Sequence, residues 1–469
     1  MLRGALLALA LLLAACGSLP TRPGAGPITD LPDDVAAVSA TSLSARYSIQ
    51  AVRLDITDRV WRVIASNYYD PQLNGVNWAA VRHRARARAA AALTDEEFYA
   101  ALKDMAAALG DSHTIVLTPR ETVDRRRFIS TRLGMQLTFV EGQVVVCEIE
   151  PGSPAALAGV SVGDVLVAVA GRRIDRAFVA DALTNPQFAR SDVLAGDGPE
   201  ALPDEPQERA RVRVLRAVRR ELRRAGPARS EGPALDFVRA DGAPLHAQLL
   251  PTALPRPPVA ALHWLDGGVA VIRMTRFVPE LRPALEAALD EAARARAVIV
   301  DLRGNGGGSV EMFNWFTGQF LAEEHLAVRT LRRNRPDGDG QRVSDEYVGP
   351  DAFAPRQRAL LQPLAVLIDG RTGSAAELAA VVLAEQRSAL LVGEPSCGCV
   401  VGVPIEYVLP DGGGVRVAET GFVTARGVRL EGAPTMPAVR VVPALADLRS
   451  GRDPVLEEAH RRMMKASAR

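Results

Sequence analysis

Between residues 259 and 442 short apolar strands alternate with helices, and this alternation limits the possible folds more than any other feature of the chain. The expected strands are 269–272, 297–301, 364–368 and 390–392, and the expected helices are 281–295, 312–321 and 376–384. The strands are continuously apolar, which is typical of parallel strands covered by helices on both faces. We therefore predict an α/β core, with sites beyond the C-terminal ends of its strands.

Two polar turns follow such strand ends. The loop from Asp301 to Ser309 contains consecutive glycines, whose unhindered N–H groups can point at a developing negative charge. It lacks the G-x-x-x-x-G-K-[ST] pattern of a phosphate cradle, although a plain tight turn remains open. The second turn places Ser374 at the start of a helix, where an exposed nucleophile would lie. Ser374 and Glu377 also fit an S-x-x-E capping box, so a helix cap is the alternative.

The N-terminus resembles the lipobox of bacterial lipoproteins. Arg3 precedes an apolar run, 6–13, that is too short to span a bilayer, and two alanines precede Cys16. The resemblance implies a signal peptide of residues 1–15 and lipidation of Cys16, and Gly17 favours the outer membrane, facing the periplasm. An ordinary secretory signal with an incidental cysteine is the alternative. Residues 16–45 are rich in proline, glycine and serine and are expected to form a tether.

Composition sets outer limits on the function. A chain of 469 residues predicts about three folded units, and a formal net charge of +1 gives no nucleic-acid footprint. Of the 56 basic residues only Lys103 and Lys465 are lysines. Helical periodicity predicts an N-terminal helical domain over residues 46–119, which contains the loop Gly110-Asp111-Ser112-His113-Thr114.

Residues 128 to about 185 resemble a PDZ domain, and we expect this domain to extend to residue 252. The resemblance is carried by Leu133-Gly134-Met135, Glu150-Pro151-Gly152-Ser153-Pro154-Ala155 and Gly163-Asp164-Val165-Leu166. It implies that the C-terminus of a protein or peptide adds to a sheet edge, with its carboxylate bound by Leu133, Gly134 and Met135. Residues 186–233 depart from the pattern and are expected to be a charged insertion. Its basic helix is expected to present a solvated face, with an anionic lipid contact as the alternative.

Three further motifs follow the PDZ-like region in order: Asp301-Leu302-Arg303-x-Asn305-x-Gly307-Gly308, Thr372-Gly373-Ser374-Ala375-Ala376-Glu377 and Val392-Gly393-Glu394. Together they resemble carboxy-terminal processing peptidases and their tricorn-like relatives. The resemblance implies a crotonase-like α/β peptidase core at residues 255–443, followed by a C-terminal helix or tail at 444–469. It also implies Ser374 as nucleophile and the N–H groups of Gly307 and Ala375 as oxyanion donors, with no metal or cofactor.

The chain departs from the Ser/Lys members of this family at the base. Their lysine aligns with Cys399, and arginine cannot deprotonate to replace it. The tricorn-like branch uses histidine and glutamate, and resemblance to its motifs implies His113 as the base and Glu431 as its partner. For Cys397 and Cys399 we expect buried or redox-inert thiols, because a disulfide between them closes a very small ring and the pair makes a poor zinc site.

The expected function is therefore a lipid-anchored serine endopeptidase that recognises protein C-termini and acts through an acyl-enzyme. The main alternative is a binding or scaffold protein of the same fold that has lost catalysis with its lysine. A second alternative is acyl-CoA chemistry, since crotonase folds use similar glycine N–H pairs, but the PDZ-like region and the serine turn argue against it. The oligomeric state cannot be predicted from the sequence.

Overall fold

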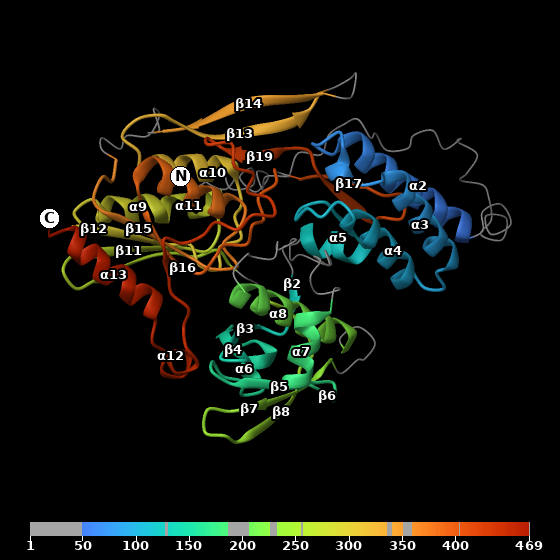
Figure 1. Ribbon diagram of the computed structural model, residues 1–469, viewed down its shortest axis with the longest axis horizontal. Coiled ribbons are helices and arrows are strands. Elements are labelled where there is room, and N and C mark those ends of the chain that lie inside the picture. The colour runs from blue at the N-terminus through green and yellow to red at the C-terminus, as the bar shows by residue number, and fades with distance from the viewer. Residues whose placement is uncertain are drawn as a thin grey trace, which may run out of the picture.

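A computed structural model describes residues 49–126, 130–185, 206–225, 232–254, 257–334, 340–349, 359–402 and 404–468. It shows an α/β core, an N-terminal helical part and a separate small domain that contains β3 to β8 (Figure 1). The predicted signal peptide, the tether and Cys16 lie outside the described residues. Within the described ranges, no helix is long and apolar enough to cross a membrane.

The core is a six-stranded sheet whose strands lie in the order β10-β11-β12-β15-β16-β20. Their bounds are β10 Ala260–Leu265, β11 Val269–Met274, β12 Ala297–Asp301, β15 Leu364–Ile368, β16 Leu390–Gly393 and β20 Val439–Arg440. Only the edge pair β10–β11 is antiparallel, and every residue of β12 and β15 is buried. The predicted α/β core is thus confirmed, and the apolar runs are buried because helices cover both faces of the sheet.

Helices α9 (Arg282–Ala292), α10 (Val310–Gly318) and α11 (Ala375–Arg387) contribute to the hydrophobic core on one face of this sheet. Helix α13 (Pro454–Ala466) packs on the other face (Figure 1). The short elements η4 (Pro279–Leu281) and α12 (Leu445–Ser450) precede α9 and α13. A three-stranded antiparallel sheet also lies beside the core, formed by β13 (His325–Arg333), β14 (Gln341–Val348) and β19 (Gly421–Thr424).

The N-terminal helical domain contains two strands from the C-terminal half of the chain. Helices α2 (Ile49–Asn67), α3 (Trp78–Ala91) and α4 (Asp95–Ala107) share one hydrophobic cluster with β18 (Gly414–Ala418). The sheet of this domain has the order β1-β18-β17, with β1 at Ile115–Leu117 and β17 at Pro404–Val408. We assigned residues 404–418 to the peptidase core, and the structure shows that their strands also pair with β1 of the N-terminal part. The pairing fixes the position of the loop before β1, which contains His113.

The PDZ-like region forms one sheet in the order β3-β4-β5-β7-β8, with β6 paired to β5 and β3 at an edge. The strands are β3 Met135–Val140, β4 Gln143–Ile149, β5 Val165–Val169, β6 Arg172–Arg173, β7 Ala234–Val238 and β8 Pro244–Gln248. The helices of this region are α6 Pro154–Leu157, α7 Arg176–Thr184 and α8 Pro206–Ala225. Strands β2 (Ser130–Arg132) and β9 (Thr252–Leu254) pair at its entry and exit, after α5 (Pro119–Arg126).

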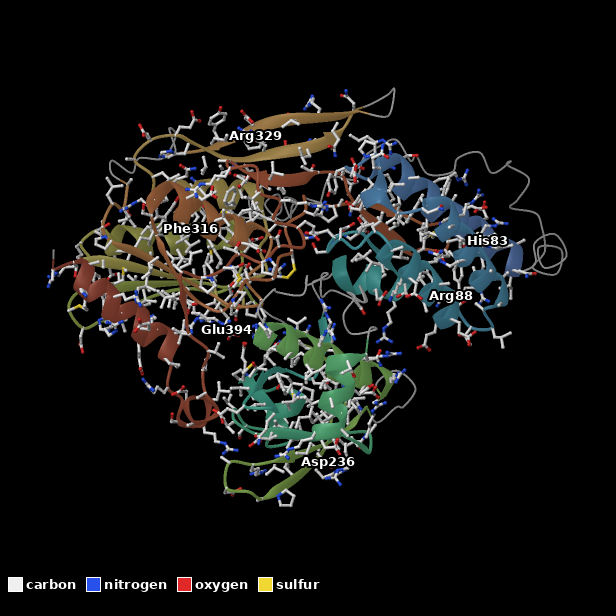
Figure 2. All side chains as sticks on the ribbon, viewed as in Figure 1. His83, Arg88, Asp236, Phe316, Arg329 and Glu394 are labelled. Carbon is white, nitrogen blue, oxygen red and sulfur yellow. A yellow bond between two sulfur atoms is a disulfide. The ribbon has the colours of Figure 1, made fainter. Side chains whose placement is uncertain are left out.

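Helix α8 lies in the segment that we predicted to be a charged insertion with a solvated face. The structure differs, because Val214, Ala217 and Val218 of this helix are buried in the hydrophobic core of the PDZ-like domain. An amphipathic helix contributes its apolar stripe to a core even when its opposite face is strongly basic. Arg211 of α8 also pairs with Glu394 at 2.5 Å, next to the boundary between this domain and the core (Figure 2).

Candidate active site

Ser374 occupies a strained turn between the buried strand β15 and helix α11. Its backbone has φ 52° and ψ −127°, a combination that L-residues rarely adopt and that persists only where the surrounding structure enforces it. The Ser374 side chain makes no capping hydrogen bond to α11, so the capping-box alternative is wrong. Gly373 N donates to Asn305 O and Ser374 N donates to Cys399 O, each at 3.0 Å. Two neighbouring loops thus fix the backbone of the turn.

The glycine loop after β12 packs directly against this turn. A Cβ built on Gly307, whose φ is +92°, lies 2.6 Å from the Cβ of Ser374, so only glycine fits. However, Gly307 N already donates to Asn305 Oδ1 at 2.9 Å, and our prediction of Gly307 as an oxyanion donor is not met in this structure. The N–H groups of Ala375 and Gly308 make no hydrogen bond to any described residue. Ala375 therefore stays a predicted donor, and Gly308 replaces Gly307 as the second candidate.

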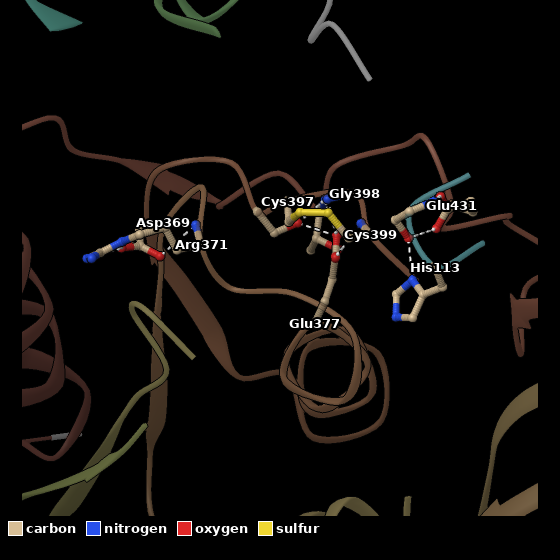
Figure 3. Close-up of a disulfide and its surroundings, with 11 residues drawn as sticks. His113, Asp369, Arg371, Glu377, Cys397, Gly398, Cys399 and Glu431 are labelled. Atoms are coloured by element: carbon tan, nitrogen blue, oxygen red, sulfur yellow. Dashed lines mark hydrogen bonds and ion pairs between the residues drawn. A yellow bond between two sulfur atoms is a disulfide. The ribbon is translucent and has the colours of Figure 1, made fainter. Parts of the chain in front are cut away.

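His113 and Glu431 are connected through Ser112, a residue that the sequence analysis did not select. Ser112 N donates to Glu431 Oε1 at 2.7 Å and Ser112 Oγ donates to Glu431 Oε2 at 3.0 Å. Ser112 Oγ also makes a short hydrogen bond with His113 Nδ1 (Figure 3). Glu431 thus reaches the imidazole through a hydroxyl. The signal was present in the sequence, because Ser112 directly precedes His113.

When Glu431 is ionised, these contacts determine the tautomer of the imidazole. A hydroxyl has a single proton to donate, so if Ser112 Oγ donates to Glu431 it must accept the hydrogen bond from the N–H at His113 Nδ1. His113 then has its proton on Nδ1 and a lone pair on Nε2. This is the tautomer that a general base needs in order to take a proton from a serine.

A continuous path of backbone contacts connects this Glu431–Ser112–His113 relay to Ser374. Gly432, next to Glu431, donates its N–H to Gly398 O at 2.8 Å. The following residue, Cys399, accepts the N–H of Ser374. Residues from positions near 113, 374, 398 and 431 are therefore gathered at one place, and Figure 3 shows His113, Glu431 and the cysteine loop near helix α11, which contains Glu377.

Burial controls the charge of Glu431. Only 6% of this residue is exposed, and burial together with the nearby Asp111 carboxylate raises its pKa to about 8, against the opposing effects of Ser112 and Arg429. Asp111 is fully buried, and burial raises its pKa as well. Asp111 Oδ1 accepts the N–H groups of His113 (2.8 Å) and Thr114 (2.6 Å), which fixes the backbone of the histidine loop.

Cys397 and Cys399 form a disulfide, so our expectation of two thiols was wrong (Figure 3). Their Cα atoms are 5.1 Å apart, within the usual range for a bridge. The loop between them turns at Gly398, which has φ +67°. Cys147 is a free cysteine, and burial raises the pKa of its thiol to about 11. Across the described part of the chain, no group of three or more His, Cys, Asp or Glu residues is placed to bind a metal ion.

The predicted carboxylate loop of the PDZ-like domain leads into the edge strand β3. Leu133 O accepts the N–H of Ala155 and Gly134 O accepts the N–H of Glu150, so both carbonyls point into the domain. Gly134 has φ +77°, and a Cβ there lies 2.0 Å from the Cβ of Ser153. Met135 begins β3. This arrangement is compatible with a peptide adding to β3, and carboxylate binding by these three residues stays a prediction.

Comparison with known protein families gives three matches along the chain. Residues 268–441 match peptidase family S41, residues 55–107 match the tricorn protease C1 domain, and residues 145–184 match a PDZ domain. A chloroplastic C-terminal processing peptidase of Tetradesmus obliquus is 25% identical over 396 residues, which cover 82% of this chain and 76% of the relative.

Two solved structures show the same fold. The photosystem II D1 C-terminal processing protease has a TM-score of 0.52 at 21% identity, covering 86% of this chain and 99% of its own. Mature CPAF in complex with lactacystin has a TM-score of 0.63 at 14% identity, covering 89% and 98%. The S41 peptidase fold with a PDZ domain is thus confirmed. The matches along the sequence together support a relation of this chain to the carboxy-terminal processing and tricorn-like peptidases.

Proposed function

We propose that this protein is a serine endopeptidase in which Ser374 is the nucleophile and His113 is the general base. The observation that carries the proposal is the hydrogen-bonded path from Glu431 through Ser112 to His113, attached through Gly398 and Cys399 to the strained turn of Ser374. Both residues are needed because a serine hydroxyl is a weak nucleophile until an adjacent base removes its proton.

The proposed reaction is acyl transfer. Ser374 Oγ attacks the carbonyl carbon of the scissile peptide bond while His113 Nε2 takes the hydroxyl proton. The N–H groups of Ala375 and Gly308 donate to the oxyanion, and the proton on His113 passes to the leaving amine. Ionised Glu431, acting through the Ser112 hydroxyl, stabilises the imidazolium that forms. Water then hydrolyses the acyl-enzyme with His113 again acting as base.

Substrate capture and location are further parts of the proposal. Among the described residues β3 pairs with β4 alone, and this edge position supports the addition of an extended substrate C-terminus as an extra strand. The sequence pattern ending at Cys16 supports lipid anchoring at the outer membrane, facing the periplasm. Incorporation of an alkyne-labelled fatty acid into the wild type but not into Cys16→Ser tests the anchor. A free C-terminus binding more tightly than an amidated one tests the carboxylate loop.

A fluorophosphonate that phosphonylates activated serines tests the catalytic assignment directly. We expect the purified mature protein to label, Ser374→Ala not to label, and His113→Ala to label at least ~10³-fold more slowly. His83→Ala is the matched control, because His83 lies exposed on α3, in the N-terminal helical domain (Figure 2). A wild type that fails to label, or a Ser374→Ala protein that labels equally, overturns the peptidase assignment and favours the binding protein.

A further inference from the structure

Glu377 lies three residues after the proposed nucleophile, yet the mechanism above gives it no task. It is on the first turn of α11 and is completely buried. Buried carboxylates are rare unless hydrogen bonds satisfy them, and this one accepts an unusual number. Oε1 accepts from Ser396 Oγ, from Gly398 N at 3.1 Å and from Thr435 N at 3.3 Å, whereas Oε2 accepts from Cys399 N at 3.1 Å.

These donors belong to the two loops that complete the site. Gly398 and Cys399 belong to the disulfide loop, whose Cys399 O accepts the N–H of Ser374. Thr435 lies at the end of the loop that begins at Glu431. It also makes two hydrogen bonds with Ser396: Thr435 N donates to Ser396 Oγ at 2.7 Å, and Ser396 N donates to Thr435 O at 3.1 Å. The Glu377 carboxylate on α11 therefore binds both the disulfide loop, which accepts the N–H of Ser374, and the loop that begins at Glu431 (Figure 3).

We propose that Glu377 is a positioning residue that fixes the position of Ser374 relative to His113 and its Ser112–Glu431 relay. It does not touch the reacting atoms in this assignment. It fixes the peptide between Gly398 and Cys399, and this peptide in turn fixes the backbone of the nucleophile. The inference rests on the proposed function, because the relative position of Ser374 and His113 affects the rate only if the two residues react together.

The carboxylate form is required because donors approach both oxygens. In Glu377→Gln one oxygen becomes an NH₂ group, which is itself a donor. The orientation that keeps the Oε1 contacts places this NH₂ against Cys399 N, and the two donors repel each other. The substitution thus displaces the residue whose carbonyl holds Ser374. Burial raises the pKa of Glu377 to about 7 against these donors, so the charged form is present near neutral pH.

The test compares the rate and the final extent of fluorophosphonate labelling in Glu377→Gln. A positioning role predicts that all of the folded protein labels, but at a second-order rate at least ~10-fold below that of the wild type, because small misplacements of reacting groups cost large factors in rate. A purely structural role predicts a smaller labelled fraction that reacts at the rate of the wild type, and this result overturns the proposal. Wild type that does not label at all contradicts the proposed function instead.

Two further variants keep the test decisive. Glu385→Gln makes the same substitution on the same helix at a carboxylate that pairs with Arg426 at 3.6 Å, and it is expected to label like the wild type. Ser396→Ala removes one donor from Glu377 and one contact to Thr435, and it is expected to slow labelling ~3- to 10-fold. If Glu377→Gln does not fold, Ser396→Ala decides, and a rate within twofold of that of the wild type overturns the proposal.

Discussion

The charge on Glu431 predicts how acylation depends on pH. Protonated Glu431 donates to Ser112 Oγ instead of accepting from it, so the Ser112 hydroxyl turns and donates to His113 Nδ1. The imidazole proton must then lie on Nε2, where the base needs a lone pair. With a pKa of about 8, roughly 10% of Glu431 is ionised at pH 7 and roughly 90% at pH 9.

We therefore expect the labelling rate of Ser374 to rise roughly ninefold between pH 7 and pH 9, with an inflection near 8. Labelling reactions with a fluorophosphonate, quenched at fixed times and corrected for reagent hydrolysis, give this dependence of the labelling rate on pH. In Glu431→Gln the amide NH₂ can donate to Ser112 Oγ at every pH, which enforces the unfavourable tautomer. Its rate at pH 9 is expected to fall about 10²- to 10⁴-fold, as for other triads held in the wrong tautomer.

A single inflection near pH 6.5, the ordinary value of a histidine, contradicts this reasoning, because it places the charge on Glu431 throughout the range. Ser112→Ala separates the relay from a direct effect of the charge. It removes the hydroxyl between Glu431 and Nδ1, so the inflection near 8 is expected to disappear together with most of the rate. Retention of that inflection in Ser112→Ala means that Glu431 acts on the site by another route.

Three more predictions concern the residues that support the site. Gly307→Ala places a Cβ 2.6 Å from the Cβ of Ser374 at φ +92°, so we expect the free energy of unfolding in urea to fall by more than about 3 kcal/mol. Gly306→Ala has open space around it, and its free energy of unfolding is expected to stay within ~0.5 kcal/mol of the wild type. Reduction of the Cys397–Cys399 disulfide by a dithiol frees the loop that accepts the N–H of Ser374. If this raises the activation free energy by about 1 kcal/mol, labelling slows roughly fivefold. Equal labelling rates before and after reduction contradict this prediction. Between pH 4.5 and 8 the folded protein keeps a proton on Glu431 that the unfolded chain has released. This group therefore lowers the free energy of unfolding by about 1.4 kcal/mol per pH unit as pH rises. Glu431→Gln is expected to remove this contribution to the pH dependence of the free energy of unfolding.

The sequence predicted the elements of the core better than the contacts between distant segments. The strand before Ser374 and the helix after it follow from local apolar runs and a glycine turn, which need no partner to be recognised. The disulfide loop and the task of Glu377 depend on which segments meet in space. Glu377 matched a local capping rule, yet donors from residues 396 to 435 bind it instead, because a tertiary contact replaced the local one.

The relay to His113 shows the same limit. The family resemblance selected the histidine and the glutamate, and the position of Ser112 beside His113 did not by itself show that its hydroxyl lies between them. Only the pairing of β1 with β18 shows how the histidine loop reaches its position, and residues 404–418 gave no sequence signal that they belong with the N-terminal helices. Backbone hydrogen bonding likewise decided against Gly307, since a glycine-rich pattern does not show which N–H is already engaged.

The strand β18 has a consequence for the order of events during synthesis. The N-terminal helices are made first, but their hydrophobic cluster includes Val415, Val417 and Ala418, which emerge from the ribosome some 300 residues later. Until then this cluster lacks the side chains of β18, and the strand after the His113 loop lacks its β18 partner. Glu431 follows shortly after. In the proposed mechanism, therefore, a growing chain cannot assemble Ser374, His113 and Glu431 until nearly all of the protein has been made.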